Sequence, residues 1–355
     1  MRTRLRLTGM LAALLAMAPA GLCAQTAGGQ ASAGQTAGRQ AAGASDFIIT
    51  PSTTEDQLDP RHFDLTEQQT RIGRDQGERM TMPVEIAGGT YDFVIDTGSQ
   101  RTIIATELAQ KLALPQLPPV EIVSMAGRVT VPVVTLSGLR YGDHFVEQMD
   151  ALSIGHADLG GAGLIGLDGL KDKRLTLDFK ARRMDIGQSR RAPKEQDDPD
   201  TIVVEARSRL GQLILVDSRI DGKRVSVILD TGAEISVGNM ALFDKLKVKK
   251  LLIPPTPTTL TSVTGVDVPA LFTVVRKISI GSVALENVPM VFLDAAPFAE
   301  LDLADRPAML LGMRMLRMFD QVAIDFGNRH VDFRLRQSAA DSAARLADAT
   351  GAHTR

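Results

Sequence analysis

Short apolar runs, many of them alternating with polar residues, dominate the chain from about residue 78 to residue 336. Residues 82–86 alternate strictly, and residues 213–216 and 272–275 are compact apolar runs. Turn-forming pairs stand between such runs, for example Gly88-Gly89 and Asp221-Gly222. A period of two bounded by Gly and Asp predicts β-strands joined by hairpins.

Helical spacing is confined to short pieces of the sequence. Apolar residues four apart occur at Leu108 and Leu112, and again at Leu242 and Leu246. Each piece follows an Asp-Thr-Gly motif by about ten residues. The pattern therefore predicts an all-β protein with a few short helices.

The apolar pattern repeats itself in order along the chain. Residues 178–186 align without gaps on residues 325–333, and Leu-Ile-Gly at 164–166 matches Leu-Leu-Gly at 310–312. The spacing between matching residues grows slowly from one end to the other, as small loop insertions in a duplicated unit would produce. We expect two similar lobes, residues 78–187 and 201–336, joined by a polar linker at 188–200.

The ends of the chain differ from these lobes. Arg2, Arg4 and Arg6 precede an apolar stretch at 7–17 and a small-residue site at 18–20. This pattern predicts a secretory signal peptide over 1–24 and an exported protein, periplasmic or secreted. An uncleaved anchor stays open, and so does lipidation of Cys23, the one cysteine, although Leu22 before it fits that processing poorly. The remaining segments are a low-complexity tether at 25–45, an arm at 46–77 and a disordered tail at 337–355.

Composition narrows the choice of function. The chain is 44% hydrophobic and 23% charged, as expected of a folded soluble protein. A net charge of -2 provides no basic surface for nucleic acid, and no stretch reaches the length of a transmembrane span. The five histidines show no metal-ligand spacing, which argues against a metal site. We expect no organic cofactor either.

Two aspartates end apolar strands in matching positions of the repeat. Asp96 follows Phe93-Val94-Ile95, and Asp230 follows Val227-Ile228-Leu229; each is succeeded by Thr-Gly. Burying one carboxylate at a strand end is costly, and a single Asp-Thr-Gly is more often a surface turn. The long-range repeat around both motifs favours a pair of carboxylates brought together for acid–base chemistry.

The paired motif, the glycine-centred hairpins and the apolar-apolar-Gly strands resemble the aspartic peptidases of the pepsin and retropepsin superfamily. The resemblance covers most of residues 80–335 and implies two pseudo-symmetric retropepsin-like β-barrel lobes in a bilobal enzyme. It implies Asp96 and Asp230 as catalytic residues acting on an extended peptide or protein substrate. Support for the catalytic loops would come from Thr97, Gly98, Ser99, Thr231, Gly232 and Ala233. Flaps over the substrate would carry Met125, Ala126, Gly127, Val263, Thr264 and Gly265.

Two departures from the pepsin pattern are visible in the motifs. The first flap lacks a tyrosine, which favours a retroviral-type unit duplicated and fused, similar to bacterial retropepsin-like proteases. Ser99 follows the first motif, whereas Ala233 follows the second. A Ser99 hydroxyl bonded to the outer oxygen of Asp96 would have no counterpart at Asp230, so we expect an asymmetric dyad.

Other interpretations of these motifs remain open at this point. The glycine hairpins are also compatible with ordinary turns. Residues 161–166 match the dinucleotide pattern G-x-G-x-x-G, but no long helix or βαβ unit follows them. The lobes also fit a non-catalytic peptide-binding module, or a dimer in which each lobe pairs with another chain. We expect a monomer whose two lobes form one intramolecular pseudo-dimer.

Overall fold

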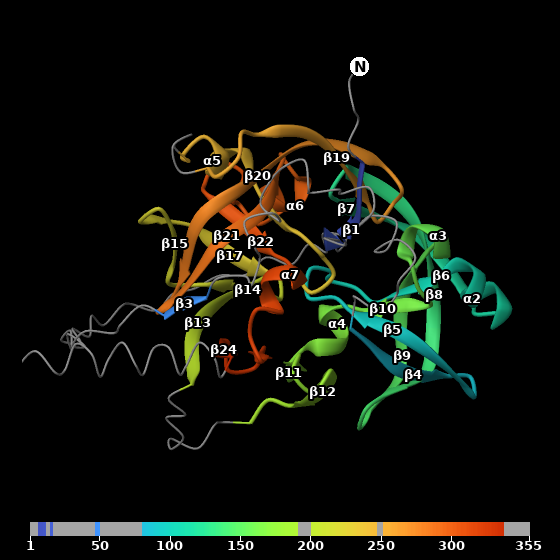
Figure 1. Ribbon diagram of the computed structural model, residues 1–355. Coiled ribbons are helices and arrows are strands. Elements are labelled where there is room, and N and C mark those ends of the chain that lie inside the picture. Colours follow the sequence, from blue (N-terminus) through green and yellow to red (C-terminus); the bar gives the residue numbers. More distant parts are fainter. Residues whose placement is uncertain are drawn as a thin grey trace, which may run out of the picture.

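The computed structural model describes residues 6–11, 15–16, 47–49, 80–190, 200–246 and 251–336. Two β-rich lobes lie side by side, the first in cyan and green and the second in yellow to red (Figure 1). The predicted all-β, two-lobed fold is confirmed. The predicted tether and tail, and most of the predicted arm and linker, lie outside the described residues.

The first lobe is a closed barrel. Strands β8, β4, β5, β10, β6 and β9 pair in that order, and β9 pairs back with β8. Buried side chains alternate along β4. They also occupy the last three positions of β5, the part of the strand that pairs with β10. The strands are β4 (Thr81–Ile86), β5 (Gly89–Ile95), β6 (Ile103–Ala105), β7 (Gln116–Ser124), β8 (Gly127–Tyr141), β9 (His144–Ile154) and β10 (Gly163–Ile165). The helices are α2 (Thr106–Lys111), α3 (His156–Leu159) and α4 (Leu167–Leu170).

The second lobe repeats this arrangement with one strand broken. The counterpart of β4 is split into β14 (Gln212–Leu215) and β15 (Ser218–Ile220), which pair with β17 and β20 respectively. The other strands are β16 (Lys223–Arg224), β17 (Ser226–Leu229), β18 (Ser236–Gly238), β19 (Thr256–Ser262), β20 (Asp267–Ile280), β21 (Val283–Phe292) and β22 (Ala308–Leu311). The helices are α5 (Met240–Phe243), α6 (Ala296–Glu300) and α7 (Met313–Leu316).

The same kind of hairpin opens both lobes. Ala87 and Gly88 join β4 to β5 with φ values of 49° and 78°. Asp221 and Gly222 join β15 to β16 with the same two values. Two consecutive residues with positive φ are typical of the tight turns that fit the twist of paired strands. The duplication therefore extends to backbone geometry.

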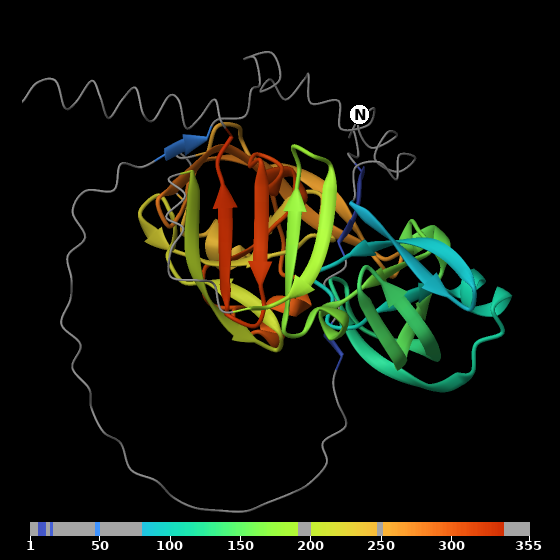
Figure 2. The same cartoon turned by 90° about the horizontal axis from the view of Figure 1, so that it is seen from below.

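A sheet shared by both halves joins the lobes at their base (Figure 2). Its strands run β12-β11-β23-β24-β13. Their bounds are β11 (Lys173–Asp178), β12 (Arg183–Gln188), β13 (Thr201–Arg209), β23 (Gln321–Asp325) and β24 (His330–Arg334). Across the junction Leu175 faces Ile324, Leu177 faces Val322, and Arg174 bonds Asp332 at 2.5 Å.

This sheet corrects the boundary of the first lobe. The sequence assigns residues 173–187 to that lobe, 78–187, but they belong to the hairpin of β11 and β12, which pairs with β23 of the second half. The apolar side chains of β11 are buried there. Each half therefore contributes its last hairpin to a common platform rather than to its own barrel.

Three short N-terminal strands pair with strands of the two lobes. β3 (Phe47–Ile49), part of the predicted arm, runs parallel to β21. β1 (Arg6–Leu11) pairs with β19, and β2 (Leu15–Ala16) pairs with β7. Both fall within the predicted signal peptide. Strand β1 therefore pairs with a hairpin of the second lobe, and β2 pairs with a hairpin of the first.

Candidate active site

The two Asp-Thr-Gly turns meet between the lobes. Asp96 follows β5 and Asp230 follows β17, and both side chains are fully buried. The backbone N–H of Asp96 donates to the carbonyl of Ile165 at 3.0 Å, and that of Asp230 to the carbonyl of Leu311 at 3.1 Å. Each aspartate is thus fixed by the apolar-apolar-Gly strand that runs parallel beside it.

The two threonines bind the loops to each other. Thr97 Oγ1 donates to the carbonyl of Leu229 at 2.8 Å, and Thr231 Oγ1 donates to that of Ile95 at 2.6 Å. Each hydroxyl also accepts the opposite threonine's backbone N–H, at 3.0 and 3.1 Å. All four bonds are buried, where each contributes about 1 kcal/mol net and leaving a partner unpaired costs more. These four hydrogen bonds fix the distance between the two loops.

Each carboxylate is held by two N–H groups of its own turn. The donors stand two and three residues after the aspartate, so the turn closes on its own side chain. Gly98 (2.8 Å) and Ser99 (3.1 Å) bond Asp96 Oδ1, and Gly232 (3.0 Å) and Ala233 (3.1 Å) bond Asp230 Oδ1.

The carboxylates lie against the opposite loop. A Cβ added to Gly98 would stand 2.5 Å from Asp230 Oδ1, and one added to Gly232 would overlap the carboxyl group of Asp96. Only glycine leaves room for this approach. The two acids therefore face each other across the pseudo-two-fold axis.

Burial determines the electrostatics at Asp230. Loss of solvent raises the pKa of the Asp230 carboxyl to about 6, against the opposing effect of the Ala233 and Gly232 N–H groups. Asp230 Oδ2 is buried and accepts no hydrogen bond from the part of the chain that the structure describes. Two facing carboxylates disfavour double ionisation, so the pair is suited to hold one shared proton.

The expected bond from Ser99 to the outer oxygen of Asp96 is not formed. The Ser99 hydroxyl donates to the carbonyl of Arg101 at 2.7 Å, and only its backbone N–H reaches Asp96. Serine side chains in turns commonly bond backbone groups close in sequence, here the carbonyl two residues further along the chain. The difference between Ser99 and Ala233 therefore does not make the dyad asymmetric in the way predicted.

Each lobe carries one hairpin at the place where the sequence predicts a flap. The first joins β7 to β8 through Met125 and Ala126, and the second joins β19 to β20. Met125 and Val263 are buried, whereas Ala126 and Gly265 are exposed. Gly127 and Thr264 are partly exposed, and Thr264 N–H donates to Ser262 Oγ at 3.4 Å. The predicted flap residues thus occupy the two hairpin tips.

Each flap contacts the opposite lobe. Arg128 in the first flap bonds Glu300 of α6 in the second lobe at 3.0 Å, and Glu121 on the flap itself at 2.8 Å. Met125 belongs to an apolar cluster with Ile228 of the second lobe. A Cβ on Gly265 would stand 2.8 Å from Asp158 Oδ1 of α3 in the first lobe. Both flaps are therefore closed across the lobe boundary.

Comparison with known families covers both halves. Residues 82–172 match the model of the gag-polyprotein putative aspartyl protease, and residues 216–315 match the aspartyl protease model. Each match includes one of the two facing aspartates. Both halves of the chain thus match aspartyl protease families, which supports an aspartic peptidase. A search of curated proteins finds no match to the sequence.

Solved structures that are similar to this chain include proteins from three organisms. A retropepsin-like aspartic protease from Rickettsia conorii is 20% identical over 38% of this chain and 89% of that one, with a TM-score of 0.25. Basic 7S globulin from soybean is 12% identical over 72% and 95%, with a TM-score of 0.32. The aspartic proteinase from Irpex lacteus is 10% identical over 72% and 94%, with a TM-score of 0.42.

The G-x-G-x-x-G pattern at 161–166 has a packing role in this peptidase fold. Gly163 lies in β10 between β5 and β6, where a Cβ would overlap the Phe93 ring. Gly166 lies against the loop that follows Asp96. A Cβ added to it would stand 2.5 Å from the backbone of Arg101. Gly312 passes the second loop in the same way, close to Ile235. These glycines permit close strand packing rather than phosphate binding.

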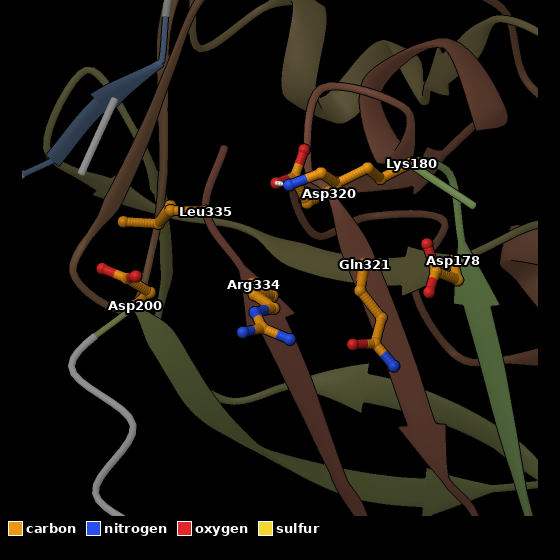
Figure 3. Close-up of a pocket in the computed structure, with 7 residues that line it drawn as sticks. All are labelled: Asp178, Lys180, Asp200, Asp320, Gln321, Arg334 and Leu335. Carbon is orange, nitrogen blue, oxygen red and sulfur yellow. Dashed lines mark ion pairs between the residues drawn. The ribbon is translucent and has the colours of Figure 1, made fainter. Parts of the chain in front are cut away.

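A cavity of about 150 Å³ lies away from the dyad, over the shared sheet (Figure 3). Its lining is mixed in charge and includes Lys180, which pairs with Asp320 at 3.9 Å. Neither aspartate of the dyad contributes to it. Among the described residues no group of His, Cys, Asp and Glu has metal-binding geometry, and no helix has the length and apolarity of a membrane span.

Sequence reasoning missed three residues that join the two halves. Arg128 and Glu300, which join the first flap to the second lobe, carry no signal, because charged residues on turns are common. Gln212 is buried at the start of β14 and donates to the Gly98 carbonyl at 3.0 Å. Its one signal is a polar residue directly before an apolar run, Leu213-Ile214-Leu215, next to a lobe boundary.

Proposed function

We propose that this protein is an aspartic endopeptidase that hydrolyses peptide bonds in extended polypeptides with a water activated by Asp96 and Asp230. The observation that carries the proposal is the pair of buried carboxylates, each lying against the glycine of the opposite loop. Because both loops belong to one chain, one monomer holds one complete site.

Hydrolysis by such a pair needs no other reacting group. The ionised carboxylate accepts a proton from the bound water as its oxygen attacks the peptide carbonyl carbon. The protonated carboxyl donates its proton to the carbonyl oxygen, giving a tetrahedral diol. The newly protonated carboxyl then donates its proton to the leaving nitrogen. The other carboxylate accepts a proton from a diol hydroxyl as the C–N bond breaks, which leaves one shared proton on the dyad. The backbone N–H groups on each Oδ1 keep the carboxylates oriented throughout.

Strand pairing between the flaps supports an extended substrate. β1 pairs with β19 and β2 with β7, so flap strands of both lobes accept an extended segment of this chain. Backbone pairing of this kind binds peptides with little dependence on their side chains. We propose that export with removal of residues 1–24 leaves these strand edges open for substrate in the periplasm or outside the cell.

The test is hydrolysis of an unfolded protein substrate as a function of pH. Because burial raises the pKa of Asp230 to about 6, the dyad keeps its proton at mildly acidic pH. We expect kcat/KM to fall as pH rises through about 6 and to fall again at low pH when both carboxyls are protonated. A transition-state analogue with a hydroxyl in place of the scissile carbonyl is expected to inhibit competitively. Peptide binding without turnover at any pH would contradict the enzyme and indicate a binding module.

The raised pKa of Asp230 also makes the stability of the fold depend on pH. The folded-state pKa of Asp230 lies above the unfolded value near ~4, so the folded protein holds more protons between these values. The contribution of this group to stability is therefore complete below about pH 4 and is lost as pH rises through about 6. Thermal unfolding of wild type and Asp230→Asn between pH 4 and 7 measures it. An unchanged difference across that range would contradict the shift.

Glu300→Gln tests closure of the first flap. The variant removes the charge that Arg128 bonds across the lobe boundary and leaves its bond to Glu121. A partly exposed ion pair is worth about 0.2–1 kcal/mol, so KM is expected to rise by up to about fivefold with kcat little changed. Wild type in 1 M salt should approach the variant. Glu121→Gln, which keeps the bond between Arg128 and Glu300, is the matched control. An equal rise in KM in both variants would show that the bond to Glu300 has no special role.

A further inference from the structure

Gln212 reaches from the second lobe into the first catalytic loop. Its side chain is 1% exposed, and Nε2 donates to the carbonyl oxygen of Gly98 at 3.0 Å. The turn before it, Leu210 and Gly211, has φ values of 50° and 86° and brings β14 up to that loop. A second bond, from Gln100 Nε2 to the Leu210 carbonyl at 2.9 Å, holds the same turn from the other side.

The Gly98–Ser99 peptide connects Gln212 to the carboxylate of Asp96. Its carbonyl accepts from Gln212, and its N–H donates to Asp96 Oδ1 at 3.1 Å. A donor on the carbonyl oxygen withdraws electron density through the peptide resonance, which makes the N–H a stronger donor. The bond from Gln212 therefore strengthens the bond that stabilises ionised Asp96.

The second catalytic loop has no such support. The Gly232–Ala233 peptide donates to Asp230 Oδ1 at the same distance, 3.1 Å. Within the described ranges, however, no side chain donates to the Gly232 carbonyl. The two loops match in every bond from their own backbone to the carboxylates and differ in this contact.

The glutamine is a costly choice for packing alone. Its Oε1 is buried and accepts no hydrogen bond from the described residues. A buried acceptor without a donor costs about 1–3 kcal/mol, whereas an apolar side chain of the same length has no such penalty. Gln212 therefore has a role that methionine at this position could not fill.

We propose that Gln212 is a positioning residue that makes the dyad asymmetric, holding Asp96 as the ionised member and leaving the shared proton on Asp230. The inference rests on the proposed peptidase function and assigns the roles within it. Asp96 is then the base toward the water, and Asp230 is the acid toward the carbonyl oxygen. The environment of Asp230 agrees, because burial raises its pKa while no side chain among the described residues donates to the Gly232 carbonyl.

The experiment compares the pH profiles of wild type and Gln212→Met. Loss of the donor destabilises ionised Asp96, so the acid limb of kcat/KM is expected to move to higher pH by about half a unit or more. We expect kcat/KM at the optimum to fall about tenfold, with KM little changed. The melting temperature should stay the same or rise, since the unpaired acceptor is gone. Gln212→Glu, which keeps the length without an amide donor, should shift the limb in the same direction.

Gln100→Met is the matched control, because it removes the bond to Leu210 and leaves the connection to Asp96 intact. Its acid limb is expected to coincide with that of wild type. The inference would be overturned if the acid limb of kcat/KM does not move in Gln212→Met, or if it moves equally in Gln100→Met. The proposed function fails separately, if wild type does not hydrolyse peptide or if Asp96→Asn retains full activity.

Discussion

Asp96→Asn and Asp230→Asn are each expected to lower kcat/KM for peptide hydrolysis by about 10⁴-fold or more. An amide in either position can neither hold the shared proton nor accept one from water. Because the two acids act as one unit, the double variant should be about as inactive as either single one. Steady-state kinetics at the pH optimum of wild type measures all three.

The structure indicates that these variants will fold. Asn keeps an Oδ1 acceptor for the N–H groups at positions 98 and 99, or 232 and 233. Asp92→Asn is the matched control, because it is an exposed aspartate in β5 four residues before Asp96. Its activity should equal that of wild type. Full activity in either dyad variant would exclude the proposed mechanism.

The sequence was sufficient to predict the meeting of the two loops. Asp96 and Asp230 occupy equivalent places in a long ordered repeat, and a duplicated unit places equivalent residues about a pseudo-two-fold axis. The repeat also explains the glycine after each Thr, because the backbone there must pass close to the carboxylate of the opposite loop. Local pattern and repeat order together predicted the lobes, the loops and the hairpin tips.

The partners of strands and side chains were less predictable. A period of two shows which face of residues 173–178 is buried, but not that β23 of the other half covers it. Ser99 has two acceptors within reach, and only coordinates show that the Arg101 carbonyl takes its hydroxyl. Gln212 acts across 114 residues of sequence, and nothing local indicates its acceptor. In each case a non-local contact decides the outcome.

Gly232→Ala is expected to lower kcat/KM by about 10²-fold, although both carboxylates remain. The added methyl group would overlap the Asp96 carboxyl, and the threonine bonds between the loops prevent them from moving apart. We expect a loss of stability of about 1–3 kcal/mol as well, because a buried overlap in a tightly bonded site has no room to relax. Gly98→Ala should behave alike through Asp230. Kinetics and urea unfolding measure the two effects.

Gly161→Ala provides the matched control for these glycine variants. A Cβ there meets no atom within 4 Å, so its activity and stability should stay close to wild type, within about 0.5 kcal/mol. Wild-type activity in Gly232→Ala would mean that the carboxylates do not lie against the opposite loops. The asparagine variants test whether the two carboxyl groups are needed for activity. The alanine variants test whether activity depends on how closely each carboxyl group lies against the opposite loop. Loss of activity in both sets requires a dyad whose chemistry depends on the spacing that Thr97 and Thr231 impose.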